Sequence, residues 1–232
     1  MIWLLVNVDC FFMSNQLRDF ENRKPNRSST NWGSTNHVFR TALTIEIGLG
    51  FIALLLGWIT GIDVRRWLPR FETDYAYSIA LSIAGGFVCT FPMIIGIDLL
   101  LRIKLRAIQE INQLEASADI KPLLELRTIE IVTLSIAAGV GEELLLRGWL
   151  MGWLLDIDAP MAFGQSVTPL ILSSLAFGLM HPITPLYMAL TGLLGFYLGA
   201  VTIWTEDLLL AMVAHASYDA IQLIQVQKRK TK

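Results

Sequence analysis

Charged side chains are scarce in this chain of 232 residues: Asp, Glu, Lys and Arg make up 16%, whereas hydrophobic residues make up 54%. A soluble domain carries about 25% charged residues, so this composition excludes an ordinary soluble protein and indicates a polytopic integral membrane protein. The formal net charge is only −2, and without a basic excess no nucleic-acid partner is expected. The expected partner is the lipid bilayer.

Cysteine and histidine are also few. The two cysteines, Cys10 and Cys89, are far apart and form no C-x-x-C pair, so neither a disulfide nor a cysteine-bound zinc is expected. No internal repeat is visible, which argues against the transporters built from inverted repeats. Of the three histidines, only His37 lies in a polar stretch, where a surface position explains it.

The apolar residues gather in six stretches long enough to be helical spans, which predicts an all-α fold, a polytopic transmembrane bundle of about six spans. We expect residues 1–37 to be a flexible polar N-terminal segment, residues 38–124 a first transmembrane hairpin with a cytoplasmic loop, and residues 226–232 a basic tail. His181-Pro-Ile-Thr-Pro185 should end one helix and begin the next. The expected spans are 40–61, 76–101, 128–155, 167–181, 185–204 and 207–225.

Basic residues are distributed unevenly between the loops. Lys and Arg number five before the first span, three after it, five after the second, none in the next three loops and four in the tail. Because cytoplasmic loops carry the excess of basic residues, both termini are expected in the cytoplasm, with the cell membrane as the location.

The stretch 141–149, Gly-Glu-Glu-Leu-Leu-Leu-Arg-Gly-Trp, places three ionisable side chains inside an apolar span. An unpaired charge in mid-bilayer costs roughly 2.5 to 3.5 kcal/mol on insertion scales, so these groups need partners. Glu143 and Arg147 are four residues apart and share a helix face, which predicts a structural ion pair. Glu142 projects about 100° away and needs a partner from another helix.

Two later stretches offer that partner, Phe177 with His181 in the fourth span and His215 with Asp219 in the sixth. Each pair is four residues apart and shares a helix face. Such side chains suit hydrolysis in two ways: as ligands of a divalent metal such as zinc, or as a carboxylate base with imidazole support and polar groups facing the oxyanion. We expect one shared site, walled by Phe177, whose four ionisable members are Glu142, His181, His215 and Asp219.

These blocks resemble the motifs of the CPBP family of intramembrane proteases, the CAAX-processing and bacteriocin-processing (Abi) enzymes. The family pattern is E-E-x-x-x-R, then F-x-x-x-H, then H-x-x-x-N, and each block falls here in an apolar span. The resemblance covers residues 125–225, which would form the catalytic helical domain. The matching positions are Glu142-Glu143 with Arg147, Phe177 with His181, and His215 with Asp219 in place of the final Asn.

The resemblance implies a membrane-embedded CAAX-type endopeptidase that hydrolyses a peptide bond near the C-terminus or leader of a peptide or protein substrate. Glu142 and His181 would activate water, while His215 and residue 219 would stabilise the oxyanion. An ionised Asp219 only accepts hydrogen bonds, whereas Asn donates them, so this departure favours a divalent metal held by the four ionisable residues, a protonated Asp219 or an altered activity. The alternatives are a binding or immunity protein of the same fold and, less favoured, a small transporter.

Overall fold

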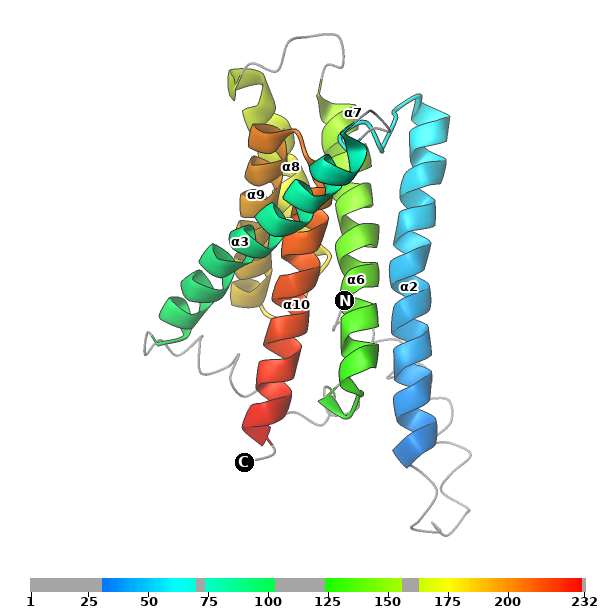
Figure 1. The fold of residues 1–232 in the computed structure, drawn as a ribbon, viewed down its shortest axis with the longest axis vertical. Helices are drawn as coiled ribbons and strands as arrows, with labels where there is room; N and C mark the ends of the chain where they lie inside the picture. Colours follow the sequence, from blue (N-terminus) through cyan, green and yellow to red (C-terminus); the bar gives the residue numbers. More distant parts are fainter. Residues whose placement is uncertain (1–30, 70–73, 103–123, 156–162, 231–232) are drawn as a thin grey trace.

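The computed structural model describes residues 31–69, 74–102, 124–155 and 163–230, and these residues form helices joined by short turns (Figure 1). The expected all-helical bundle is confirmed over these ranges. The elements are α2 (Asn31–Thr60), α3 (Tyr75–Leu101), α6 (Thr128–Glu143), the π-helix η2 (Leu144–Met151), α7 (Gly152–Leu154), α8 (Phe163–Leu179), α9 (Pro185–Thr205) and α10 (Leu208–Lys230).

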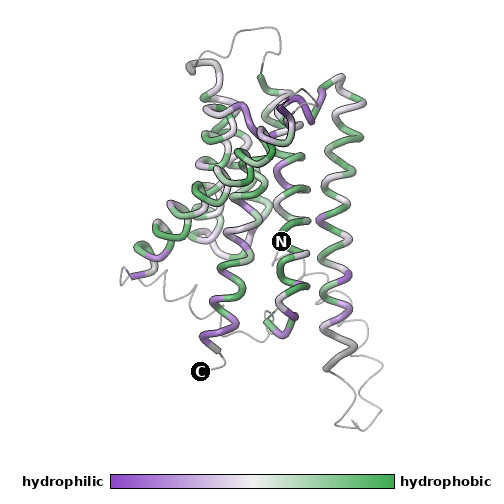
Figure 2. The backbone as a smooth tube through the Cα atoms, in the orientation of Figure 1, coloured by the Kyte–Doolittle hydropathy of each residue, from purple (hydrophilic) through white to green (hydrophobic). Residues whose placement is uncertain are grey.

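Four of these helices are long and apolar enough to cross a membrane: Thr35–Thr60, Tyr75–Leu100, Pro185–Thr205 and Leu208–Arg229. Ser166–Leu179 is a shorter apolar helix. Large apolar side chains such as Phe51, Trp58, Phe91 and Leu193 are exposed on the outside of the bundle, and apolar residues run along most of its length (Figure 2). This surface suits lipid rather than water, so the chain is an integral membrane protein. The full count of six spans stays a prediction.

The expected span 128–155 is one rod made of α6, η2 and α7, which follow each other without a break. Three of its four charged side chains are almost fully buried: Glu142 is 2% exposed, and Glu143 and Arg147 are 0% exposed. The rod changes from α-helix to π-helix directly after Glu143. Such π segments are frequent at functional sites.

Two glycines let neighbouring helices approach this rod closely. A Cβ on Gly139 would lie 2.7 Å from the Met212 carbonyl oxygen on α10, and a Cβ on Gly141 would overlap the Glu46 carbonyl oxygen on α2. Glycine is therefore required at both contacts. As a result α2 and α10 pack on opposite sides of the segment that carries the two glutamates (Figure 1).

Two expected boundaries are corrected by the structure. Helix α2 begins at Asn31, so residues 31–37, expected to be flexible, are helical, while residues 1–30 lie outside the described ranges. The helix extends this far because Val38 and Ala42 pack against Leu126 and Ile131. Likewise α10 continues to Lys230, so most of the expected tail is helix, and Gln227 donates to the Leu124 and Leu126 carbonyls.

Candidate active site

The turn between α8 and α9 places the first histidine. Helix α8 ends at Leu179, and Thr184 caps α9 by accepting a hydrogen bond from the Tyr187 amide at 3.1 Å. This confirms the helix break expected from the two prolines. His181 follows the end of α8, and its Nδ1 lies 2.8 Å from the Phe177 carbonyl oxygen. A carbonyl only accepts, so Nδ1 is the donor, and a neutral His181 presents the lone pair of Nε2.

Glu143 holds the second histidine. Its Oε1 accepts from Arg147 Nη1 at 2.9 Å and lies 2.9 Å from His215 Nδ1. Arg147 also donates from Nη2 to the Gly195 carbonyl at 2.7 Å. The expected ion pair is therefore confirmed, and Glu143 has a second role that the sequence did not predict: it orients His215 so that its Nε2 points away from Glu143.

Glu142 faces both histidines. Its Oε2 lies 4.0 Å from His181 Nε2 and 3.9 Å from His215 Nε2, and His215 Nε2 lies 3.6 Å from Asp219 Oδ2. The prediction that the three motifs meet is confirmed by these distances. Glu142 Oε2 is buried and has no hydrogen-bond partner. The roles of these residues in catalysis stay a prediction.

Phe177 packs between the charged groups. Its ring centroid lies 4.9 Å from that of His181 and 5.6 Å from that of His215, and the Arg147 guanidinium carbon lies 4.9 Å from the ring centre. One apolar side chain thus fixes both imidazoles and covers the cation. This position agrees with the expected wall of the site.

The spacing of the donor atoms bears on what the site can hold. Ligand atoms around tetrahedral zinc, at bonds of about 2.1 Å, lie about 3.4 Å apart; the gaps of 3.9 and 4.0 Å at Glu142 are wider, and the gap of 3.6 Å between His215 and Asp219 is close to this value. In the described ranges no group of three or more His, Cys, Asp or Glu side chains is arranged to hold a metal ion. Gaps beyond 3.5 Å between polar atoms suit a bridging water instead.

Two further polar residues near the cluster were not singled out from the sequence. Glu46 of α2 lies within Coulombic range of Glu142, Asp219 and His215. Tyr187 of α9 lies within range of Asp219 and Glu142, and its ring centroid is 6.3 Å from that of His181. The sequence alone could have identified Glu46, because a carboxyl in the middle of an apolar span is a candidate functional group. Nothing in the sequence distinguishes Tyr187 from an ordinary tyrosine of an apolar helix.

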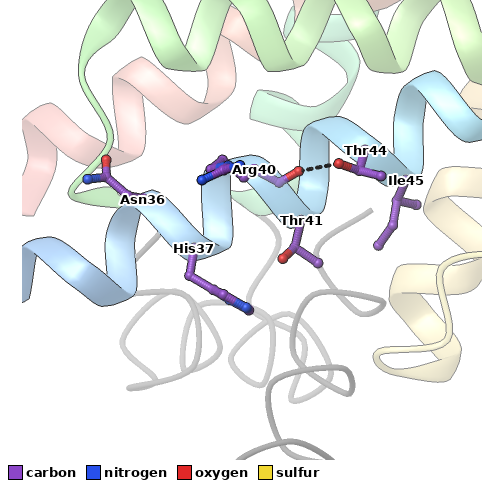
Figure 3. Close-up of a pocket in the computed structure, with 6 residues that line it drawn as sticks. All are labelled: Asn36, His37, Arg40, Thr41, Thr44 and Ile45. Carbon is purple, nitrogen blue, oxygen red and sulfur yellow. Dashed lines mark hydrogen bonds between the residues drawn. The ribbon is translucent and has the colours of Figure 1, made fainter.

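A pocket of about 530 Å³ opens elsewhere, along α2 (Figure 3). The described side chains that line it all come from this one helix, and none of them belongs to the three motifs. It is therefore separate from the cluster of glutamates and histidines. Its lining residues are Asn36, His37, Arg40, Thr41, Thr44 and Ile45.

Comparison with known proteins gives one match. The family model described as type II CAAX prenyl endopeptidase, Rce1-like, matches residues 125–221. Comparisons with curated proteins and with solved structures give no match. The matched residues carry all three motifs and the whole of the cluster around Glu142, so this part of the chain is similar to type II CAAX prenyl endopeptidases, in agreement with the resemblance to CPBP proteases.

Proposed function

We propose that this protein is an intramembrane endopeptidase that hydrolyses a peptide bond close to the C-terminus of a membrane-associated substrate. The observation that carries the proposal is the triangle of Glu142 Oε2, His181 Nε2 and His215 Nε2, which leaves gaps of 4.0 and 3.9 Å at a buried, unpartnered carboxylate oxygen. One water molecule at about 2.8 Å from two polar atoms bridges a gap of this width. The family match supports the same activity.

Glu142 and His181 act together on that water. The water donates one hydrogen bond to Glu142 and one to the lone pair of His181 Nε2, so its oxygen is directed towards a substrate carbonyl. Glu142 then takes a proton as the water oxygen bonds to the carbonyl carbon and the carbonyl electron pair moves to oxygen. When the C–N bond breaks, Glu142 gives this proton to the leaving nitrogen, and the products are a carboxylic acid and an amine.

His215 stabilises the oxyanion in this scheme. Glu143 accepts from Nδ1 and so fixes the ring, which leaves Nε2–H of a protonated His215 to donate to the oxygen that gains charge. Asp219 lies 3.6 Å from the same nitrogen and holds it in place. The scheme needs no metal ion, and the donor spacing described above supports a water-filled site over a zinc site.

The test is cleavage by purified protein in proteoliposomes. The probe is a quenched fluorescent peptide with a farnesylated cysteine in a C-terminal C-a-a-X sequence, alongside the same peptide without the lipid. Loss of general-base catalysis should slow Glu142→Gln by about 10²–10⁴-fold, whereas Thr133→Ser, on the exposed side of α6, serves as the matched control. An adaptor or immunity protein of the same fold would show no cleavage that depends on Glu142.

We infer that the protein lies in the cell membrane with both termini in the cytoplasm. The N-terminal end of α2 and the C-terminal end of α10 lie at the same end of the bundle (Figure 1). Residues 1–40, 102–127 and 228–232 carry five, five and four Lys or Arg residues, against three between α2 and α3. The positive-inside rule then places this end in the cytoplasm.

A further inference from the structure

Glu46 is a buried carboxyl group that the scheme above does not use. It is 1% exposed, and neither of its oxygens has a hydrogen-bond partner among the described residues. An ionised carboxylate buried without a partner costs several kcal/mol, so a group in this position holds a proton in preference to a charge. A neutral carboxylic acid has one O–H donor, and here that donor has no acceptor in the described protein.

The backbone places Glu46 beside the reacting groups. Helix α2 meets α6 at the Glu46 carbonyl and Gly141, with no room for a side chain on the glycine, and Gly141 directly precedes Glu142. The carboxyl lies within Coulombic range of Glu142, Asp219 and His215. These residues come from α6 and α10, two of the three elements that carry the motifs. Glu46 is therefore buried on the side of α2 that packs against α6, and it does not face the lipid.

The site lacks a neutral donor at the position where the family pattern has one. Hydrolysis of an amide needs donors aimed at the oxygen that becomes negative. The family pattern has an Asn at residue 219, whose amide donates, whereas an ionised Asp219 accepts only and repels an oxyanion. Of the two residues expected to face the oxyanion, His215 and Asp219, only His215 is then left as a donor.

We propose that Glu46 is a further catalytic residue of this site: its protonated carboxyl group donates a hydrogen bond to the substrate's carbonyl oxygen as that oxygen gains charge. The proposal rests on the proposed peptidase function. No bond to Glu46 forms or breaks, and its proton stays on Glu46 through the reaction. The α2 helix, which lies outside residues 125–221, thereby becomes part of the catalytic site.

The first test compares two replacements of nearly equal size. Glu46→Gln keeps a neutral donor, whereas Glu46→Leu removes it. In the farnesyl-peptide assay, Glu46→Leu should lower kcat by about 10²–10³-fold, the effect of losing one oxyanion donor, and Glu46→Gln should stay within about tenfold of wild type. Both proteins should unfold thermally like wild type, because Leu leaves no buried polar group unpaired. Thr133→Ser, on the exposed side of α6, should keep its activity.

The proposal is overturned if Glu46→Leu cleaves like wild type, or if Glu46→Gln is as slow as Glu46→Leu. Failure of the peptidase assignment looks different, since Glu142→Gln would then lose nothing. A second measurement needs no substrate: infrared difference spectra in lipid should show the carbonyl stretch of a protonated carboxyl in wild type and Asp219→Asn, and lose it in Glu46→Gln. A band that survives Glu46→Gln overturns the assignment of the proton to Glu46.

Discussion

A single oxygen, Glu143 Oε1, meets both Arg147 and His215. It thereby links a helix-packing interaction to the orientation of a proposed catalytic imidazole. Because all three groups are buried, water does not replace a contact that a substitution removes. Stability and activity should therefore respond differently to single and double replacements here.

Arg147→Ala should lower stability by roughly 3 to 5 kcal/mol, because Glu143 remains as a buried charge without its cation. The double variant Glu143→Gln/Arg147→Met removes both charges and should recover most of the folded yield. It should still cleave slowly, since the carboxylate that holds His215 Nδ1 is gone. Thermal unfolding in detergent and the peptide assay measure the two effects separately. An Arg147→Ala protein of wild-type stability with slow turnover would instead assign Arg147 to the chemistry.

The effect of replacing Asp219 distinguishes a metal-dependent mechanism from a metal-free one. Without a metal, Asp219→Asn adds a neutral donor near His215 Nε2 and removes a charge that repels the oxyanion, so turnover should rise several-fold, within the limit of about 10²–10³-fold for one donor. Wild type should also resist chelators. If a metal is used, Asp219→Asn should instead lose zinc affinity and activity together. Zinc titration and cleavage before and after chelation give the answer.

The sequence predicted the motif residues better than it predicted their surroundings. Glu142, His181 and His215 could be found because an ionisable side chain in an apolar span must have a partner. The same reasoning applies to Glu46, but no second polar group at helical spacing accompanies it. The contact of Glu143 with His215 joins residues 72 positions apart. Spacing along one helix carries no information on such a contact.

At the scale of elements, the rod from α6 to α7 contains a π-helix that the hydrophobic pattern of the sequence does not predict. The sequence predicts a continuous helix there, and the rod is continuous, but residues 144–151 form a π-helix. An i→i+5 helix has no residue preference strong enough to show in sequence and arises where packing demands it. Within this segment Arg147 reaches both Glu143 and Gly195. The π-helix thus lets one guanidinium join α6 to α9.

Gly139 sets the distance between α6 and α10, the two helices that bring Glu142 to His215. A Cβ there would lie 2.7 Å from the Met212 carbonyl and 3.0 Å from the Ala216 amide nitrogen, so Gly139→Ala must push α10 away. Overpacking should cost about 1–3 kcal/mol, and a shift near 1 Å at the site should slow cleavage by about 10²-fold. Thermal unfolding and kcat measure both effects.

The matched control is Gly96→Ala on α3, where a Cβ meets nothing within 4 Å. Replacing a helical glycine by alanine at an open position should leave activity unchanged and stabilise by up to about 1 kcal/mol. If Gly139→Ala cleaves as fast as Gly96→Ala, the close approach of α6 and α10 does not position the site.

At the scale of the whole molecule, three arginines near the loop after α2 oppose the proposed orientation, because basic residues favour the cytoplasmic side. The fold accommodates two of them. Arg65 lies 3.3 Å from Asp63, and Arg66 stacks on Trp67 with its guanidinium carbon 4.1 Å from the ring centre. Burial lowers the pKa of Arg66, while Asp63 acts against this shift. Arg70 lies outside the described ranges.

The orientation can be measured with single cysteines in a cysteine-free background. Asn36→Cys and Arg229→Cys lie at the end of the bundle that is assigned to the cytoplasm. Arg65→Cys lies in the loop at the other end of the bundle. All three positions are exposed. A membrane-impermeant maleimide added to intact cells should label only Arg65→Cys, because the other two face the interior. Permeabilised cells should label all three, which controls for reactivity. Labelling of both Asn36→Cys and Arg229→Cys from outside would show that the bundle has the opposite orientation. Labelling of only one of them would show that an odd number of spans, α2 included, separates the two positions.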